Sequence, residues 1–241
     1  MKKYLLLIAA VFSFATAFSQ THFYMNFGYN LGYAKLGGLN YVVDRYNETR
    51  TWLTDDMDDF HLPNGFCASL GGSNRKLMFD LTWVGRHMTR SAGGPQPTNG
   101  KMGQREIKWR FNTFNFGLGV ALGKTKYSRV NIGVSFDFGT EKVFTRVGEE
   151  GVFNPEEFQE VEKELMLGST LFMQIILSPG IPGALFIRPY VQFPYFGTNV
   201  GNAAYNINSA TYQNDDITMY DSNSWNAGVQ LQIGLFGSRE D

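Results

Sequence analysis

Eight segments of the chain place a large apolar or aromatic side chain at every second position, with small or amide residues between. In the segment 21–34, for example, Phe27 and Tyr29 alternate with Asn26 and Gly28. The same alternation recurs in 65–70, 77–83, 114–122, 130–139, 170–177, 185–195 and 225–235. A period of two predicts β-strands whose two faces meet different surroundings. The chain is therefore predicted to be all-β, with eight strands.

The connections between these segments alternate in length. The short ones are rich in turn residues and span 71–76, 123–129 and 178–184. The long ones span roughly 35–61, 90–105, 145–165 and 197–223. An even number of strands, with short turns on one side and long loops on the other, is typical of outer-membrane barrels. We predict an eight-stranded antiparallel up-and-down transmembrane β-barrel, with short periplasmic turns, long extracellular loops and both termini in the periplasm.

The size difference between the two faces predicts which one points outward. The interior of an eight-stranded barrel only just holds its side chains, so small and polar residues such as Gly28, Gly119 and Gln230 fit inside. Large residues such as Phe27 and Leu118 then face outward, which suits lipid. A secreted barrel with a dry aromatic core is the alternative. Aromatic girdles are expected at Tyr29, Tyr33, Trp83, Tyr195 and Trp225 on the long-loop side, and at Phe23, Phe186 and Phe236 on the other.

The N-terminus has the features of a secretory signal. Lys2 and Lys3 precede an apolar run, and a small-x-small site ends at Ser19. Cleavage after Ser19 would leave a signal peptide of 1–19 and a barrel domain of 20–241; an uncleaved anchor is the alternative. With 21 basic and 22 acidic side chains, the chain offers no electrostatic case for binding nucleic acid.

This pattern resembles the small outer-membrane barrels of the OmpA transmembrane-domain type, over 21–236. The signal ending "AFSQ" is similar to those of Bacteroidota. The resemblance implies a non-enzymatic structural or accessory component of an outer-membrane complex, such as type IX secretion or envelope assembly. Outer-membrane lipid, lipopolysaccharide and proteins of that complex are the implied partners, and we expect no cofactor and no metal.

The inward positions of the predicted barrel collect a balanced set of charges and amides. Two acids and two arginines can pair there, as buried charges must. We interpret the set as a plug that keeps the barrel rigid; a proton or ion path, a narrow channel and a small-ligand site are the alternatives. Its members are Asp80, Arg86, Asp137, Arg188, Gln174, Gln192 and Gln230.

His87 shares the outward face with Trp83, and Thr89 follows it on the same face. The pair resembles the outward His-x-Ser of outer-membrane lipid A deacylases, with Thr in place of Ser. The resemblance implies a lipid A-modifying enzyme as an alternative function, in which Glu106 would orient His87. A positively charged rim residue beside lipid phosphates is the simpler interpretation.

The long loops carry their own signals. Apolar spacing near 39–53 predicts a short helix, and Asn154 followed by Pro155 predicts another over 154–165. The acidic run 55–61 is interpreted as a solvated loop rather than a cation site, because it lacks the ligand spacing of a calcium loop.

The strand direction around 107–113 has two interpretations. Lys108 and Arg110 face outward with Phe114 if no bulge intervenes. A bulge near Asn112 would instead turn Trp109 outward.

Overall fold

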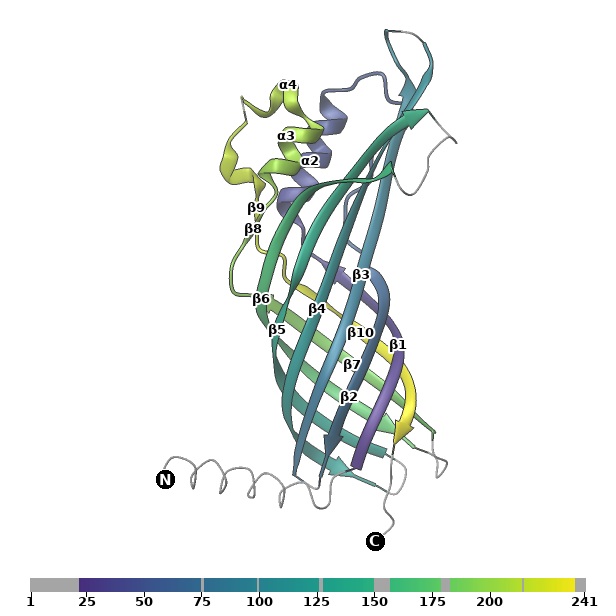
Figure 1. Cartoon of the computed structure of the whole chain (residues 1–241), viewed down its shortest axis with the longest axis vertical. Coiled ribbons are helices and arrows are strands. Elements are labelled where there is room, and N and C mark those ends of the chain that lie inside the picture. Colours follow the sequence, from purple (N-terminus) through teal and green to yellow (C-terminus); the bar gives the residue numbers. More distant parts are fainter. Residues whose placement is uncertain are drawn as a thin grey trace.

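The computed structural model describes residues 22–74, 76–98, 100–125, 128–149, 157–178, 183–213 and 215–236. Eight antiparallel strands close into a barrel in the order β1–β10–β7–β6–β5–β4–β3–β2 (Figure 1). The predicted fold class is confirmed, since strands joined along the chain are also neighbours in the barrel. The strands are β1 (His22–Ala34), β2 (Asn64–Ser73), β3 (Leu77–Pro95), β4 (Met102–Lys124), β5 (Ser128–Glu149), β6 (Gln159–Leu177), β7 (Gly183–Pro194) and β10 (Asn226–Phe236).

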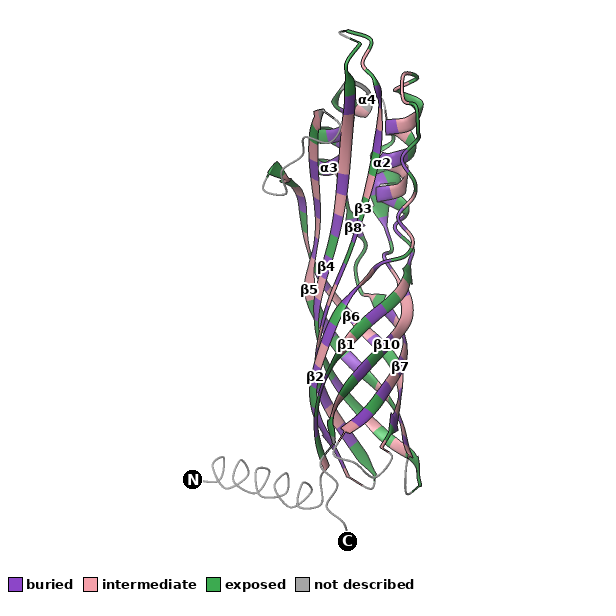
Figure 2. Ribbon diagram, turned by 90° about the vertical axis from the view of Figure 1, so that its right-hand side faces the viewer, coloured by how far each residue is buried: buried purple, intermediate pink, exposed green. Residues whose placement is uncertain are grey.

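The large side chains of the barrel face outward, as predicted. Phe27, Leu118 and Ile233 are 55%, 56% and 71% exposed, whereas Asn26 and Gln230 are buried. Each strand alternates exposed and buried positions over this region (Figure 2). Closure of the ring pairs every strand here with two neighbours. The outer wall is therefore a continuous apolar band around a polar interior.

One predicted girdle residue belongs to the interior instead. Phe186 is fully buried and its ring lies 5.4 Å from that of Tyr24, with the two planes tilted by 46°. Its neighbours Leu185 and Ile187 lie on the outward side of β7. The alternation itself therefore places Phe186 inward, and assigning it to a girdle was wrong.

Four of the strands continue well beyond the closed barrel. β2 leaves β3 at the pair Asn64–His87, and β7 leaves β6 at Pro194–Gly168. Beyond these points β3 to β6 form an open four-stranded sheet (Figure 1). Most of the predicted loops 90–105 and 145–165 is thus strand.

The helix predicted over 154–165 is also wrong. Residues 159–165 belong to β6 and pair with β5, so the cross-strand ladder overrides the local helix signals. Asn154 and Pro155 lie outside the described residues, as does the predicted signal peptide.

Helices pack on the inner face of this open sheet. The helix predicted near 39–53 is confirmed as α2 (Gly37–Glu48). The segment after β7 holds β8 (Thr198–Asn199), α3 (Gly201–Ile207), α4 (Ser209–Tyr212), the 3-10 helix η2 (Ile217–Tyr220) and β9 (Asp221–Ser222). We call this part the distal domain: residues 35–62 and 197–224 with the sheet 87–111 and 141–166. Among the described residues, no helix is long and apolar enough to cross a membrane.

The distal domain has a dry core of the kind found in water-soluble proteins. Ile107, Trp109 and Val143 from the sheet are at most 1% exposed, as are Leu39 and Val43 from α2. Here the apolar side chains face inward, the reverse of the barrel below. The chain therefore changes from a wall with an apolar exterior to a domain with an apolar interior along the same strands.

Side-chain amides hold the connecting segment 49–63 against α2. Asn40 accepts from the Phe60 amide at 2.8 Å, and Asn47 both accepts from and donates to the Met57 backbone at 3.0 Å. Asn208, beyond α3, donates to the Val42 carbonyl at 2.9 Å. These bonds satisfy backbone groups that a loop would otherwise leave unpaired, so the distal domain is a defined structure.

Candidate functional site

All seven residues predicted for the interior are buried there, on strands β3, β5, β6, β7 and β10. Arg188 of β7 forms an ion pair with Asp80 of β3, and its Nη1 donates to Thr82 Oγ1 at 2.9 Å. The guanidinium lies over the Phe172 ring, 3.7 Å from its centre. β3 and β7 stand on opposite sides of the ring, with three strands between them in either direction. This ion pair therefore bridges the barrel from wall to wall.

A second bridge joins the same two strands nearer the distal domain. Arg86 Nη1 of β3 donates to Gln192 Oε1 of β7 at 2.8 Å. Gln192 Nε2 in turn donates to Asp137 Oδ2 at 2.8 Å, and Ser135 donates to Asp137 Oδ1 at 2.6 Å. The amide of Gln192 thus connects the second arginine to the second acid. Charge is balanced through a relay rather than through a direct ion pair.

The two remaining predicted residues take different places. Gln174 accepts a hydrogen bond from Asn131 at 3.3 Å, below the bridges and toward the short turns. Gln230 is buried on β10, and its Oε1 has no hydrogen-bond partner among the described residues. The interior thus holds two bonded sets, one around Asp80 and Arg188 and one around Asp137 and Arg86, and Gln174 lies outside both.

The strands do not assemble the histidine site of a lipid A deacylase. His87 is exposed on the outer face and its cross-strand partner is Arg110. Glu106 pairs with Ser91, four residues further along β3, and its carboxylate binds Arg146 at 2.7 Å. Thr89 is exposed beside Lys108. The acid needed to orient His87 is thus held elsewhere.

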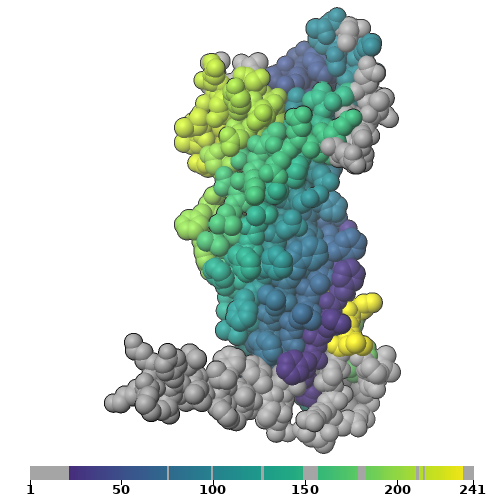
Figure 3. Space-filling model, viewed as in Figure 1, coloured from purple at the N-terminus to yellow at the C-terminus, as the bar shows by residue number. Residues whose placement is uncertain are grey.

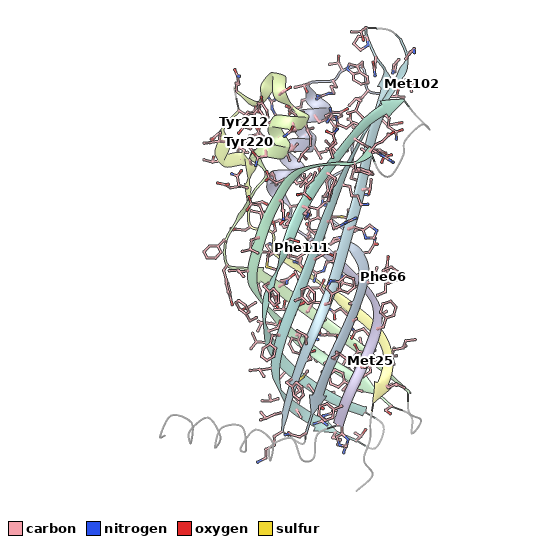
Figure 4. All side chains as sticks on the ribbon, viewed as in Figure 1. Met25, Phe66, Met102, Phe111, Tyr212 and Tyr220 are labelled. Atoms are coloured by element: carbon pink, nitrogen blue, oxygen red, sulfur yellow. The ribbon has the colours of Figure 1, made fainter. Side chains whose placement is uncertain are left out.

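The two interpretations of residues 107–113 are resolved by the ladder between β3 and β4. Pairing runs without a register shift from Pro95–Met102 to Leu77–Val120. Lys108 and Arg110 therefore face outward, while Trp109 and Phe111 are buried (Figure 4). No bulge interrupts β4 at Asn112.

The sequence interpretation missed a buried carboxylate at the base of the distal domain. Glu141 of β5 is 3% exposed, and its Oε1 accepts from Trp109 Nε1 at 2.7 Å. It lies three residues beyond Phe138, the last exposed apolar residue in the barrel part of β5, and opposite Glu164 of β6. Burial raises the pKa of Glu141 to about 7, against the smaller opposing effect of the Trp109 hydrogen bond. Extending the alternation of 130–139 by two residues would have placed Glu141 inward.

One side of the distal domain carries exposed apolar side chains on a fixed support. Tyr205, Ile217 and Met219 are 56%, 66% and 49% exposed. The Tyr212 ring contacts the rings of both Tyr205 and Tyr220, with centroid separations of 5.7 and 5.5 Å. Figure 3 shows the segment from about 200 to 222, in yellow-green, as a lobe standing out from the strands. We call this surface the distal lobe.

Comparisons with known proteins give a likeness of shape alone. No family model matches the sequence. No curated protein matches it either. Among solved structures, the chain is similar to Ail, the attachment invasion locus protein of Yersinia pestis, solved in complex with the heparin analogue sucrose octasulfate. The two are 9% identical, with a TM-score of 0.45, covering 90% of this chain and 99% of that one. The fold is assigned from the strand ladders of this chain.

Metal ligands do not gather in the described ranges. Within them, no group of three or more His, Cys, Asp or Glu side chains could hold an ion. This includes the acidic run 55–61, where Arg90 Nε donates to the Asp59 carbonyl at 2.9 Å.

Proposed function

We propose that the protein is an integral outer-membrane β-barrel that displays a folded extracellular domain. In this role it is a non-enzymatic structural or accessory component of an outer-membrane complex. The short turns and both ends of the described barrel would face the periplasm. The observation that carries the proposal is the reversal of apolar side chains along β3 to β6, from outward in the barrel to inward in the distal domain.

The apolar outer wall supports the membrane location. Large side chains face outward on every barrel strand, and they include Phe116, Val134 and Leu171 at 52%, 48% and 55% exposed. A water-soluble barrel would bury such a band, whereas lipid is its natural solvent. The crossing bridges of Asp80–Arg188 and Arg86–Gln192 support a rigid, braced wall. The interior network is proposed to be structural.

A charge placed in the apolar band separates a membrane protein from a soluble one. Ile132→Arg, at a site now 47% exposed, is expected to lower the free energy of unfolding from vesicles by about 2 kcal/mol, because lipid does not solvate the guanidinium. Thr140→Arg lies on the same face of β5, above the band, and should change it by less than about 0.5 kcal/mol. Equal effects of the two substitutions in urea unfolding would contradict a membrane location.

The distal lobe supports a role in binding a partner. Tyrosine and methionine, both present on this surface, are enriched at protein interfaces. The partly buried ion pair of Arg45 with Asp215 at 2.9 Å, and the hydrogen bond of Tyr220 to Asp215 at 2.6 Å, hold this surface in place. A fixed surface loses little conformational entropy on binding. The type IX secretion apparatus and the envelope assembly machinery are the complexes proposed for it.

Co-purification from crosslinked membranes tests this role. Full-length protein should recover stoichiometric partners, and Ile217→Asp should reduce their recovery at least tenfold, because the carboxylate would be desolvated at the interface. Met102→Asp is the matched control: it is also an exposed apolar residue of the distal end, away from the lobe (Figure 4). Recovery of the barrel alone, or equal loss in both variants, would count against the proposal.

A further inference from the structure

Four basic side chains form one row across the outer face of the open sheet. His87 pairs with Arg110, Arg110 with Lys142, and Lys142 with Lys163. These residues stand on four adjacent strands, about 4.8 Å apart, so that the row spans roughly 14 Å. We call it the basic row. Strand pairing alone brings these residues together, since they lie far apart in the sequence.

Positive charge exceeds negative charge on this surface. Lys142 binds Glu160 at 2.5 Å, but no described carboxylate lies within ion-pair distance of Arg110 or Lys163. Arg110 instead lies against the Phe144 ring, 5.4 Å from its centre. Cations held on aromatic rings keep their charge available to an anion.

The next position along β4 adds to this excess. Partial burial is the main reason that the pKa of Lys108 is lowered, and the positive charges of Arg110 and Arg146 lower it further. The nearby carboxylates therefore do not fully neutralise the positive charge of this surface. Lys108 and Arg146 both lie over the Phe158 ring, at 5.3 and 4.3 Å from its centre. The basic row is therefore part of a wider cationic surface.

The height of the basic row above the apolar band matches the headgroup region. Trp83, Phe114 and Phe138 are paired and form an aromatic row across β3, β4 and β5 toward the distal end of the barrel. The basic row lies four residues beyond them, or about 13 Å along the strands. With the usual strand tilt this is roughly 10 Å along the membrane normal, at the outer edge of the polar zone that flanks the hydrocarbon. Lysine and arginine are long enough to reach phosphates from there.

We propose that the basic row is a binding site for the phosphate groups of lipopolysaccharide in the outer leaflet. Arg110 supplies a planar fork that matches two phosphate oxygens, and Lys142 and Lys163 supply point charges beside it. The width of the row lets one headgroup engage more than one cation. The site rests on the proposed membrane location, because only that orientation brings the glycolipid to it.

Lipid retention by the purified full-length protein tests the site. The protein is reconstituted in vesicles of phosphatidylcholine with a small fraction of lipopolysaccharide, recovered in mild detergent, and analysed for bound lipopolysaccharide. R110Q/K163Q removes the two cations that lack a described carboxylate partner, and we expect at least a tenfold loss of affinity. K76Q/K124Q is the matched control, since it also removes two exposed charges but at the opposite end of the barrel. The control should bind as the unmodified chain does.

Two further probes identify what is recognised. Enzymatically dephosphorylated lipopolysaccharide should bind as weakly to the unmodified chain as the intact lipid does to R110Q/K163Q. Inorganic phosphate at millimolar concentration should not compete; full competition would replace the lipid site with a free-anion site and overturn the proposal. Equal retention by R110Q/K163Q and K76Q/K124Q would also overturn it. Flotation with the vesicles is measured on the same samples, so failure of membrane insertion is seen separately from failure of lipid binding.

Discussion

Replacing Asp80 by alanine is expected to destabilise the barrel by about 3–5 kcal/mol, the range for removing one partner of a buried ion pair. The substitution leaves the Arg188 guanidinium, 2% exposed, with Thr82 and the Phe172 ring as its described contacts. Neither neighbour carries a compensating charge. Because Arg188 and Asp80 join opposite walls, the loss should appear as a lower urea midpoint for the whole barrel in vesicles.

Two companion variants separate charge from packing. Removing both charges with Asp80→Leu and Arg188→Met should recover most of the loss, since an apolar pair of similar volume needs no partner. Asp58→Ala, at an exposed acid of the distal domain, should leave the midpoint within about 0.5 kcal/mol. If D80A proved as stable as the double variant, the bridge would not be structural, and the proton-path interpretation would regain support.

Much of the barrel was predictable because lipid and lumen impose opposite demands on alternate residues. Phe27 and Asn26 differ in the solvent they meet, and a one-residue slip would exchange them. That constraint fixes both strand identity and orientation. It also fixes which side of β4 carries Lys108, once the ladder is known to lack a bulge.

The distal domain was less predictable, since its contacts join distant segments. Asn154 and Pro155 predict a helix over 154–165, yet pairing with β5 makes residues 159–165 a strand. The alternation of short and long connections predicted four separate loops. In the structure these segments pack together into one domain. Trp109 and Glu141 meet only through strand pairing, and Arg110, Lys142 and Lys163 align for the same reason. Sequence predicts each side chain's face well, but it does not predict register between strands.

The distal domain is expected to lose stability as pH rises from about 4.5 to about 7, because of Glu141. Its pKa in the folded chain is about 7, raised chiefly by burial, against about 4.5 for an exposed glutamate. The folded state is therefore more stable with Glu141 neutral than with Glu141 ionised. The contribution of Glu141 is complete below about pH 4.5, decreases above that value, and is lost once pH has risen through about 7. A difference of this size corresponds to about 3 kcal/mol between the two limits.

Glu141→Gln isolates this effect, because glutamine keeps an oxygen for the Trp109 indole and carries no charge. Amide hydrogen exchange in α2 and the sheet 103–111, measured from pH 5 to pH 8, should show protection that falls with pH in the unmodified chain and changes little in the variant. Asp56→Asn, an exposed acid of the same domain, should retain the full dependence. The two profiles should diverge as pH rises from about 4.5 to about 7 and run parallel above that. A variant whose profile still follows the unmodified chain would show that Glu141 is already ionised in the fold, and that the Trp109 hydrogen bond compensates for its burial.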